Sequence, residues 1–173
     1  MVANSLQLIF AKDAADSVWL ACWQRMEDDG VIEKVFYDGT VSTPEGFVQE
    51  MRLPYVHPHI VCVDGTPAGI VWLTNLEGRM ARAHFLTFKE HSKIARHLGR
   101  FAFQQLLTYT YEDGSYIFDV IFGMTPCSNM LAVNTCIKSG FKKVGVLPNG
   151  AWIAAKGKSE NMIVTAVTRE DVL

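Results

Sequence analysis

The chain has 173 residues, a length that suits one domain with a sizeable hydrophobic core. Its formal net charge of −2 argues against a nucleic-acid-binding protein, because such proteins are usually basic. The four cysteines have no C-x-x-C spacing, the N-terminus has no signal-peptide pattern, and no apolar run approaches the roughly 20 residues of a membrane crossing. We therefore expect a cytoplasmic protein with a single domain over residues 1–173 and no nucleic-acid or membrane partner.

The first third of the chain predicts a strand followed by two helices. The strand is expected over residues 5–10. Asp13 is the candidate cap of a helix in which apolar residues recur every three or four positions, and Gly30 ends this helix. Residues 42–45 have the spacing of a capping box with Pro in the first turn, which predicts the start of the second helix. The residues between the two helices are expected to form a loop.

The middle of the chain changes to the two-residue period of a sheet. An antiparallel meander is expected, with strands at residues 60–63, 68–73 and 80–88. A polar segment then leads to a long amphipathic helix, which is expected to extend from about Ile94 to Tyr111.

The last third predicts a strand at residues 116–122, a helix at 130–139 and closing strands at 141–147 and 162–168. Residues 150–161 are expected to form a long exposed loop. The strand at 162–168 is a candidate edge strand, which makes the protein a candidate homo-oligomer. Together these elements predict an α/β fold with a single mixed, mostly antiparallel twisted sheet flanked by helices.

The most informative motif is Asn129-Met130-Leu131-Ala132, followed at helical distance by Lys138-Ser139-Gly140-Phe141. It comes directly after an apolar strand-like run, so the order is strand, polar loop, helix, glycine stop and strand. This pattern resembles the C-terminal signature of the GNAT superfamily of acyl-CoA N-acyltransferases, over about residues 60–141. The resemblance implies an enzyme that transfers an acyl group, most commonly acetyl, from acetyl-CoA to a primary amine of a small molecule or a peptide by direct attack.

The resemblance also implies a groove for acetyl-CoA, at the point where the strands ending at residue 88 and near residue 123 part. Backbone groups of Leu86, Thr87 and Phe88 would bond the pantetheine arm there, and N–H donors could steady the oxyanion of the tetrahedral intermediate. Asn129 would bond the same arm from the other side. A second interpretation of Asn129, as the N-cap of the helix that follows it, is equally well supported by propensity.

The pyrophosphate is expected at the start of the helix at Ile94, because a helix N-terminus offers unpaired N–H groups and the positive end of the dipole. The expected contacts are Lys93, Ile94, Ala95, Arg96 and His97. A solvated basic helix face is the alternative interpretation of this cluster.

In the GNAT superfamily the turn that holds the pyrophosphate usually has a basic residue or Gln, followed by two positions with small residues such as Gly. This segment can be aligned with that turn in two registers. One register begins at Arg96 and puts Phe101 where a small residue is expected. The other begins at Lys93 and puts Arg96 and Leu98 at the small positions. We prefer the second register because its loop length is ordinary, and Gly99 then becomes a small mid-helix residue that allows close packing.

Two residues are candidates for proton transfer. Seven positions after Asn129 the family commonly has a Tyr that protonates the departing thiolate, and this chain has Cys136. A thiol with an ordinary pKa of about 8.5 is a weaker match for that role, and a small buried residue is the alternative interpretation. His84 is the candidate base for the acceptor amine, with Glu77 and Glu90 less favoured.

No metal site is predicted, because strand alternation places Cys62 and the nearby His59 on opposite faces. Two other functions stay open. A noncatalytic acyl-CoA sensor is favoured by Cys136 in place of Tyr and by the altered glycine turn. The other is an α/β interaction domain that binds no nucleotide. The acceptor has no diagnostic motif in the sequence.

Overall fold

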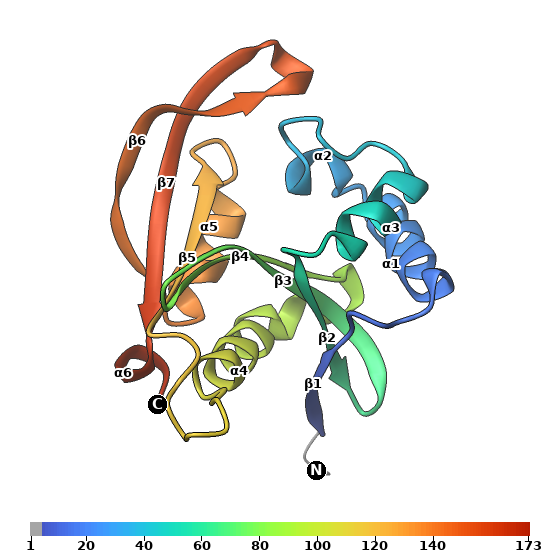
Figure 1. Ribbon diagram of the computed structural model, residues 1–173. Helices are drawn as coiled ribbons and strands as arrows, with labels where there is room; N and C mark the ends of the chain where they lie inside the picture. Colours follow the sequence, from blue (N-terminus) through green and yellow to red (C-terminus); the bar gives the residue numbers. More distant parts are fainter. Residues whose placement is uncertain (1–4) are drawn as a thin grey trace.

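The computed structural model describes residues 5–173, which contain one seven-stranded mixed sheet in the order β1-β2-β3-β4-β5-β7-β6 (Figure 1). The strands are β1 (Leu6–Phe10), β2 (His57–Val63), β3 (Thr66–Glu77), β4 (Met80–Thr87), β5 (Val120–Pro126), β6 (Lys142–Ile153) and β7 (Lys158–Thr168). Only the neighbours β4 and β5 are parallel, and every other pair is antiparallel. The predicted fold class is therefore confirmed.

Six helices and two short 3-10 helices accompany the sheet. They are α1 (Asp16–Asp28), α2 (Ile32–Val35), α3 (Pro44–Arg52), η1 (Lys89–Ile94), α4 (Ala95–Leu107), α5 (Met130–Lys138), η2 (Ala154–Lys156) and α6 (Arg169–Val172). Helix α3 starts within the predicted segment with Pro44 in its first turn, but the cap is Thr43, whose hydroxyl accepts the Gly46 N–H at 3.1 Å, and not Ser42 of the predicted capping box. The predicted cap of α1 by Asp13 is wrong, because this helix begins at Asp16 without a side-chain cap.

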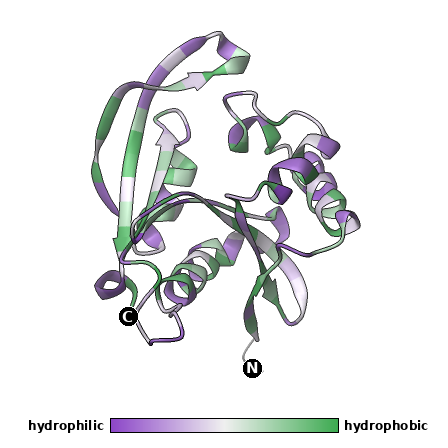
Figure 2. Ribbon diagram, in the orientation of Figure 1, coloured by the Kyte–Doolittle hydropathy of each residue, from purple (hydrophilic) through white to green (hydrophobic). Residues whose placement is uncertain are grey.

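Helices cover both faces of the sheet (Figure 1). On one face α1 and α3 pack against Ile70 and Trp72 of β3, in a core that includes Trp19 and Phe47. On the other face α4 packs against the alternate β3 residues, such as Val71. In Figure 2 both α1 and α4 show green and purple turns, as expected for helices with one buried side and one solvent side.

The C-terminal third differs from the prediction. Residues 150–161 do not form a loop, because β6 continues to Ile153 and returns through η2 and Gly157, whose φ is +59°, into β7. Strand β7 lies between β5 and β6, so the edge strand is β6 and the prediction of an edge at residues 162–168 is wrong. Pro148 and a register shift between Leu147 and Ala151 interrupt β6, which is a usual protection of an edge.

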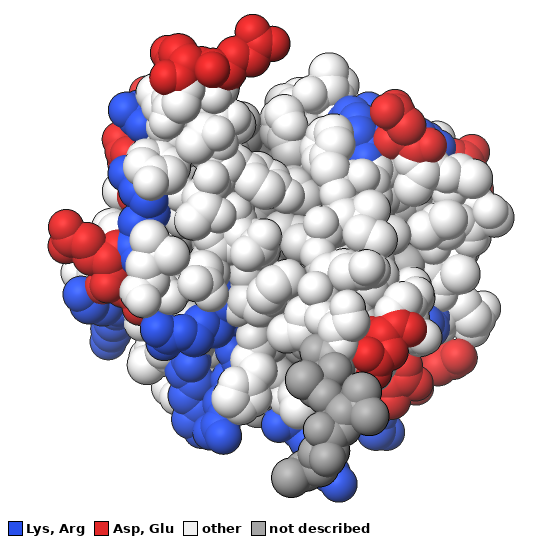
Figure 3. Space-filling view, turned by 90° about the horizontal axis from the view of Figure 1, so that it is seen from below, with Lys and Arg blue, Asp and Glu red and all other residues white. Residues whose placement is uncertain are grey.

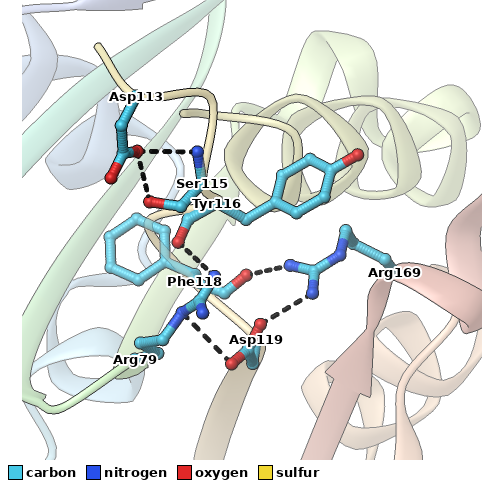
Figure 4. Close-up of polar contacts among 7 residues, drawn as sticks. All are labelled: Arg79, Asp113, Ser115, Tyr116, Phe118, Asp119 and Arg169. Carbon is cyan, nitrogen blue, oxygen red and sulfur yellow. Dashed lines mark hydrogen bonds and ion pairs between the residues drawn. The ribbon is translucent and has the colours of Figure 1, made fainter. Parts of the chain in front are cut away.

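A polar clamp holds the first residues of β5 against the start of β4 and the C-terminal end of β7 (Figure 4). The Asp119 carboxylate bonds Arg169 at 2.7 Å and Arg79 at 3.2 Å. The same two guanidinium groups also donate to backbone carbonyls, Arg169 to Phe118 and Arg79 to Tyr116. Strand β5 itself covers residues 120–126 and not the predicted 116–122, and the clamp on the residues just before it fixes one end of the junction between β4 and β5.

The molecular surface carries both signs of charge. On the face in Figure 3 the centre is uncharged, and Lys and Arg gather along one edge where Asp and Glu interrupt them. Within residues 5–173, no helix combines the length and the apolar character that a membrane crossing requires.

Candidate functional site

The central feature of the site is a parting of β4 from β5. The two strands pair only from Met80 and Val120 up to Arg82 and Phe122. Beyond this point β4 continues to Thr87 and β5 to Pro126 without pairing to each other. The backbone groups of β4 that face this gap are therefore available to a ligand, as the resemblance implies.

A cavity of about 280 Å³ occupies the parting. Its walls come from both halves of the sheet, from the segment around α2, from the start of α4 and from α5. The lining residues are Val31, Lys34, Val35, Tyr37, Trp72, Ala83, His84, Phe85, Leu86, Thr87, Ser92, Ala95, Phe103, Gly123, Met124, Thr125, Asn129, Leu131, Ala132, Thr135, Cys136 and Phe141. The size and mixed lining suit a small-molecule site.

One wall of the cavity is closed by a contact between segments far apart in the sequence. The Ala154 N–H, at the tip of the β6–β7 hairpin, donates to the Tyr37 carbonyl at 2.9 Å. Tyr37 and Met124 also pack on the small core of Ala151, Ile153 and Met162. The hairpin therefore positions two lining residues, a role that the predicted loop could not have.

His84 is on the cavity wall and is held from two sides. Its ring stacks on Trp72, and its Nε2 lies 3.2 Å from the Thr74 hydroxyl. Burial is the main cause that lowers the pKa of His84 to about 3, with a smaller contribution in the same direction from the nearby Arg82 and an opposite one from Asp38. The imidazole is therefore neutral at neutral pH.

Cys136 and Asn129 reach the cavity from α5. Burial raises the pKa of the Cys136 thiol to about 11, so the thiol stays protonated at neutral pH. The Asn129 side-chain oxygen accepts the Ala132 N–H at 3.3 Å, which confirms its interpretation as the N-cap of α5. Asn129 also lines the cavity, and the cap uses only the oxygen of its side-chain amide, which has two N–H donors as well.

The start of α4 lies beside the cavity. Ala95 lines it, and the cap position, Ile94, provides no side-chain hydrogen bond to the first turn. The Ala95 N–H already donates to the Ser92 carbonyl of η1, so only N–H groups after Ala95 in this turn would be left for an anion. Arg96 and His97 lie in that first turn, and the Arg96 Nε is 3.4 Å from the His97 Nε2.

The backbone of Phe88, which is predicted to bond the pantetheine arm, already has partners within the protein. Its N–H donates to Ala68 at 3.0 Å, and its carbonyl accepts the His91 N–H at 2.9 Å. The Phe88 side chain is buried beneath the Arg25 guanidinium, 3.8 Å from its ring centroid. The N–H is therefore occupied, whereas the carbonyl keeps a second lone pair.

Sequence reasoning found part of the cavity. The predicted site residues that line it are His84, Leu86, Thr87, Ala95, Asn129 and Cys136, whereas Phe88, Lys93, Ile94, Arg96 and His97 do not. Four of the missed lining residues, Val31, Lys34, Val35 and Tyr37, come from the region around α2, which was expected to be a loop without a motif. The sequence signal there is weak: Val31 and Val35 are one helical turn apart, and Tyr37 follows two residues later.

Neither a protein-family model nor a curated protein sequence matches the chain. Solved structures do match it over nearly its whole length. An acetyltransferase from Salmonella typhimurium, which modifies the N-terminal serine of ribosomal protein L7/L12, is 11% identical with a TM-score of 0.75 and 97% coverage of both chains. The L7/L12 α-N-protein acetyltransferase RimL, solved with coenzyme A in a disulfide to a cysteine of that enzyme, is 13% identical with a TM-score of 0.73, over 99% of this chain and 98% of RimL.

A third similar structure is the spermidine N-acetyltransferase of Vibrio cholerae, solved with coenzyme A and spermine. It is 15% identical, has a TM-score of 0.72 and covers 96% of this chain and 97% of that enzyme. At these identities the comparisons show that the chain shares an α/β fold with the acetyltransferases. In particular, this chain has the fold of the GNAT N-acetyltransferases.

Proposed function

We propose that the protein is an N-acetyltransferase that moves an acetyl group from acetyl-CoA to a primary amine. The observation that carries the proposal is the unpaired stretch of β4 and β5 beyond Arg82 and Phe122, with a cavity between the two strands. The fold supports it, because the similar structures with this fold are acetyltransferases and two of them were solved with coenzyme A.

Several groups in the cavity suit coenzyme A. The Thr87 hydroxyl is buried with no hydrogen-bond partner among residues 5–173, and an amide of the pantetheine arm would satisfy it. Leu86 offers backbone groups on the same strand, and Asn129 faces them from α5. The uncapped first turn of α4, with Lys93, Arg96 and His97 around it, is the proposed place for the pyrophosphate.

Cys136 is the proposed proton donor to the departing thiolate. In the transfer, the bond from the amine nitrogen to the acetyl carbon forms and the bond from that carbon to sulfur breaks. One proton leaves the nitrogen and one reaches the sulfur. A thiol whose pKa is raised to about 11 carries the required proton at neutral pH, although a pKa closer to 7 would transfer it more readily.

His84 is the proposed contact of the acceptor amine. With a pKa lowered to about 3, its imidazole is a weak base, so we propose that it accepts a hydrogen bond from the amine and that the proton passes on to water. Trp72 and Thr74 fix the ring in the orientation that this hydrogen bond requires.

Two measurements test the proposal. Titration calorimetry with acetyl-CoA is expected to show binding, and no detectable heat at millimolar concentration would contradict the proposal. Release of free thiol over a panel of primary amines then separates an enzyme from a noncatalytic acyl-CoA sensor. The sensor alternative is favoured by Cys136 at the position of the usual Tyr, and it requires binding without thiol release from any amine.

A further inference from the structure

The acceptor side of the cavity is poor in negative charge. On the sheet face covered by α1 and α3, the cavity is lined by Val31, Lys34, Val35, Tyr37 and Trp72. None of the residues that line it within the described chain is Asp or Glu. A polyamine loses the hydration of several ammonium groups when it binds, and only carboxylates or many carbonyls can offset that loss. This wall is therefore unsuited to a polycation.

Arg82 lies at the point where the two strands part. It is the last β4 residue paired to β5, opposite Phe122, and it pairs to Thr74 of β3 on the other side. Strand alternation places its side chain on the same face as His84. Its Nε is buried without a hydrogen-bond partner, and no ion pair joins Arg82 to another residue of the described chain.

Arg82 is not itself among the lining residues, but it adjoins Ala83 and lies near enough to the lining residue His84 to lower its pKa, so its unpaired Nε makes it a candidate anion site beside the cavity. The guanidinium is always charged, has five donors and matches the geometry of a carboxylate. A buried guanidinium N–H without a partner is costly, and a bound carboxylate would remove that cost. Lys34, which is exposed at the cavity wall and has no ion pair within residues 5–173, adds a second positive charge.

The nearest negative group does not cancel this charge. Asp38 acts on His84 more weakly than Arg82 does. The Asp38 carboxylate is also engaged, because it accepts the N–H of Thr40 at 3.1 Å and its hydroxyl at 2.7 Å. The field at His84 therefore favours an anion beside the incoming amine over a second cation.

We propose, on the basis of the proposed function, that the acceptor is a small amine carrying a carboxylate, of the class of α-amino acids with apolar or aromatic side chains. The carboxylate binds Arg82, the amine meets His84, and the side chain packs on the apolar wall that includes Val35 and Tyr37. The positive charge of Arg82 also disfavours the protonated form of the amine. This assists the attack, which needs the neutral amine.

The test compares matched pairs of acceptors in the thiol-release assay. Phenylalanine and leucine are each compared with the amine that lacks the carboxylate, phenethylamine and isopentylamine, and spermine is included. We expect kcat/KM for each amino acid to exceed that of its amine by about tenfold or more, because a charge-assisted contact is lost in the amine. Spermine is expected to be the poorest acceptor.

Substitutions test whether Arg82 causes the preference for the amino acid over its amine. Arg82→Gln is expected to bring the ratio between amino acid and amine close to one, and Arg82→Lys to restore part of it. Lys143→Gln, at an exposed position of β6, is the matched control and keeps the ratio of the wild type. Calorimetry with acetyl-CoA accompanies each variant, because a folded variant retains cofactor binding.

The outcomes separate the two proposals. The inference about the acceptor is overturned if wild-type protein binds acetyl-CoA but has its highest kcat/KM with spermine. It is also overturned if kcat/KM is the same with and without the carboxylate, or if no amino acid is acetylated. An Arg82→Gln variant that binds acetyl-CoA and keeps the preference overturns the role of Arg82. Failure of the wild type to bind acetyl-CoA overturns the proposed function itself.

Discussion

The imidazole of His84 lies flat on the indole of Trp72, with ring centroids 4.9 Å apart and planes only 5° from parallel. The indole belongs to the core beneath α1 and α3, so the contact joins the cavity wall to that buried core. Stacking removes water from one face of the imidazole, and the Thr74 hydroxyl occupies its Nε2. Because the imidazole of His84 is held in this buried position, it resists protonation.

The first prediction concerns stability in mild acid. The pKa of His84 is lowered to about 3 in the folded protein and is about 6.5 in the unfolded chain, so between these values the unfolded state binds the extra proton. Stability is therefore lost as the pH falls below about 6.5. Between pH 7 and pH 5, urea denaturation of His84→Gln is expected to show a loss smaller than that of wild type by about 1–2 kcal/mol.

Wild type and variant share the other titrating groups, so the difference between them isolates His84. The lowered pKa values of His57 and His59 act in the same direction, and the raised pKa of Glu50 acts in the opposite one. An equal loss of stability in both proteins would show that His84 is protonated normally in the folded state.

The second prediction places the pyrophosphate. Arg96→Glu puts a negative charge in the first turn of α4, where we propose that a phosphate binds, and we expect the Kd for acetyl-CoA to rise about tenfold or more at low salt. Lys138→Glu, in the last turn of α5, reverses a charge outside the cavity lining and is the control. Unchanged affinity of Arg96→Glu would place the pyrophosphate elsewhere.

The sequence predicted those elements that depend only on residues close together in the chain, such as helix caps and strand alternation. The helix start near residues 42–45, the Asn129 cap and the strand over residues 68–73 depend on neighbouring residues or on a two-residue period, and all three are found. Site residues on β4 and α5 were found for the same reason, because the family motif marks them in the sequence.

Long-range pairing decided the rest. Residues 150–153 continue β6 because they pair with β7 across a bulge at Asn149, whose φ is +54°, and no local signal reveals that pairing. Lys34 and Tyr37 reach the cavity because the fold brings their segment to the β6–β7 hairpin. The pairing of the Phe88 N–H with the Ala68 carbonyl is also long-range, and spacing alone could not identify it.

The third prediction concerns the packing of α4 on α5. A β-carbon added at Gly99 would lie 2.4 Å from the Ser139 Oγ and 3.2 Å from the Phe85 ring, so Gly99→Ala forces Ser139 to move. That movement disturbs the hydrogen bonds from the Ser139 hydroxyl to Thr135, at 2.8 Å, and to Arg96, at 3.3 Å. We expect a net loss of about 1–2 kcal/mol by urea denaturation, after the gain in helix propensity from Ala.

A double-mutant cycle checks the cause. Ser139→Ala removes the nearest clashing atom, so the loss in Gly99→Ala/Ser139→Ala is expected to be smaller than the sum of the single losses. Gly145→Ala in β6, where nothing lies within 4 Å of the added carbon, is expected to change stability little. Additive losses would show that the contact between Gly99 and Ser139 does not limit the packing.

The last prediction tests Cys136 as the proton donor. Cys136→Ala removes the thiol from the cavity wall, and kcat for thiol release is expected to fall by about tenfold to a hundredfold, with KM for acetyl-CoA within about threefold of wild type. The fall lies at the low end for acid catalysis because a thiolate is a tolerable leaving group. Cys136→Ser keeps a proton at the same place and is expected to restore part of kcat. A fall in kcat for Cys136→Ala that Cys136→Ser does not relieve would point to packing of α5, and an unchanged kcat would assign the proton to water.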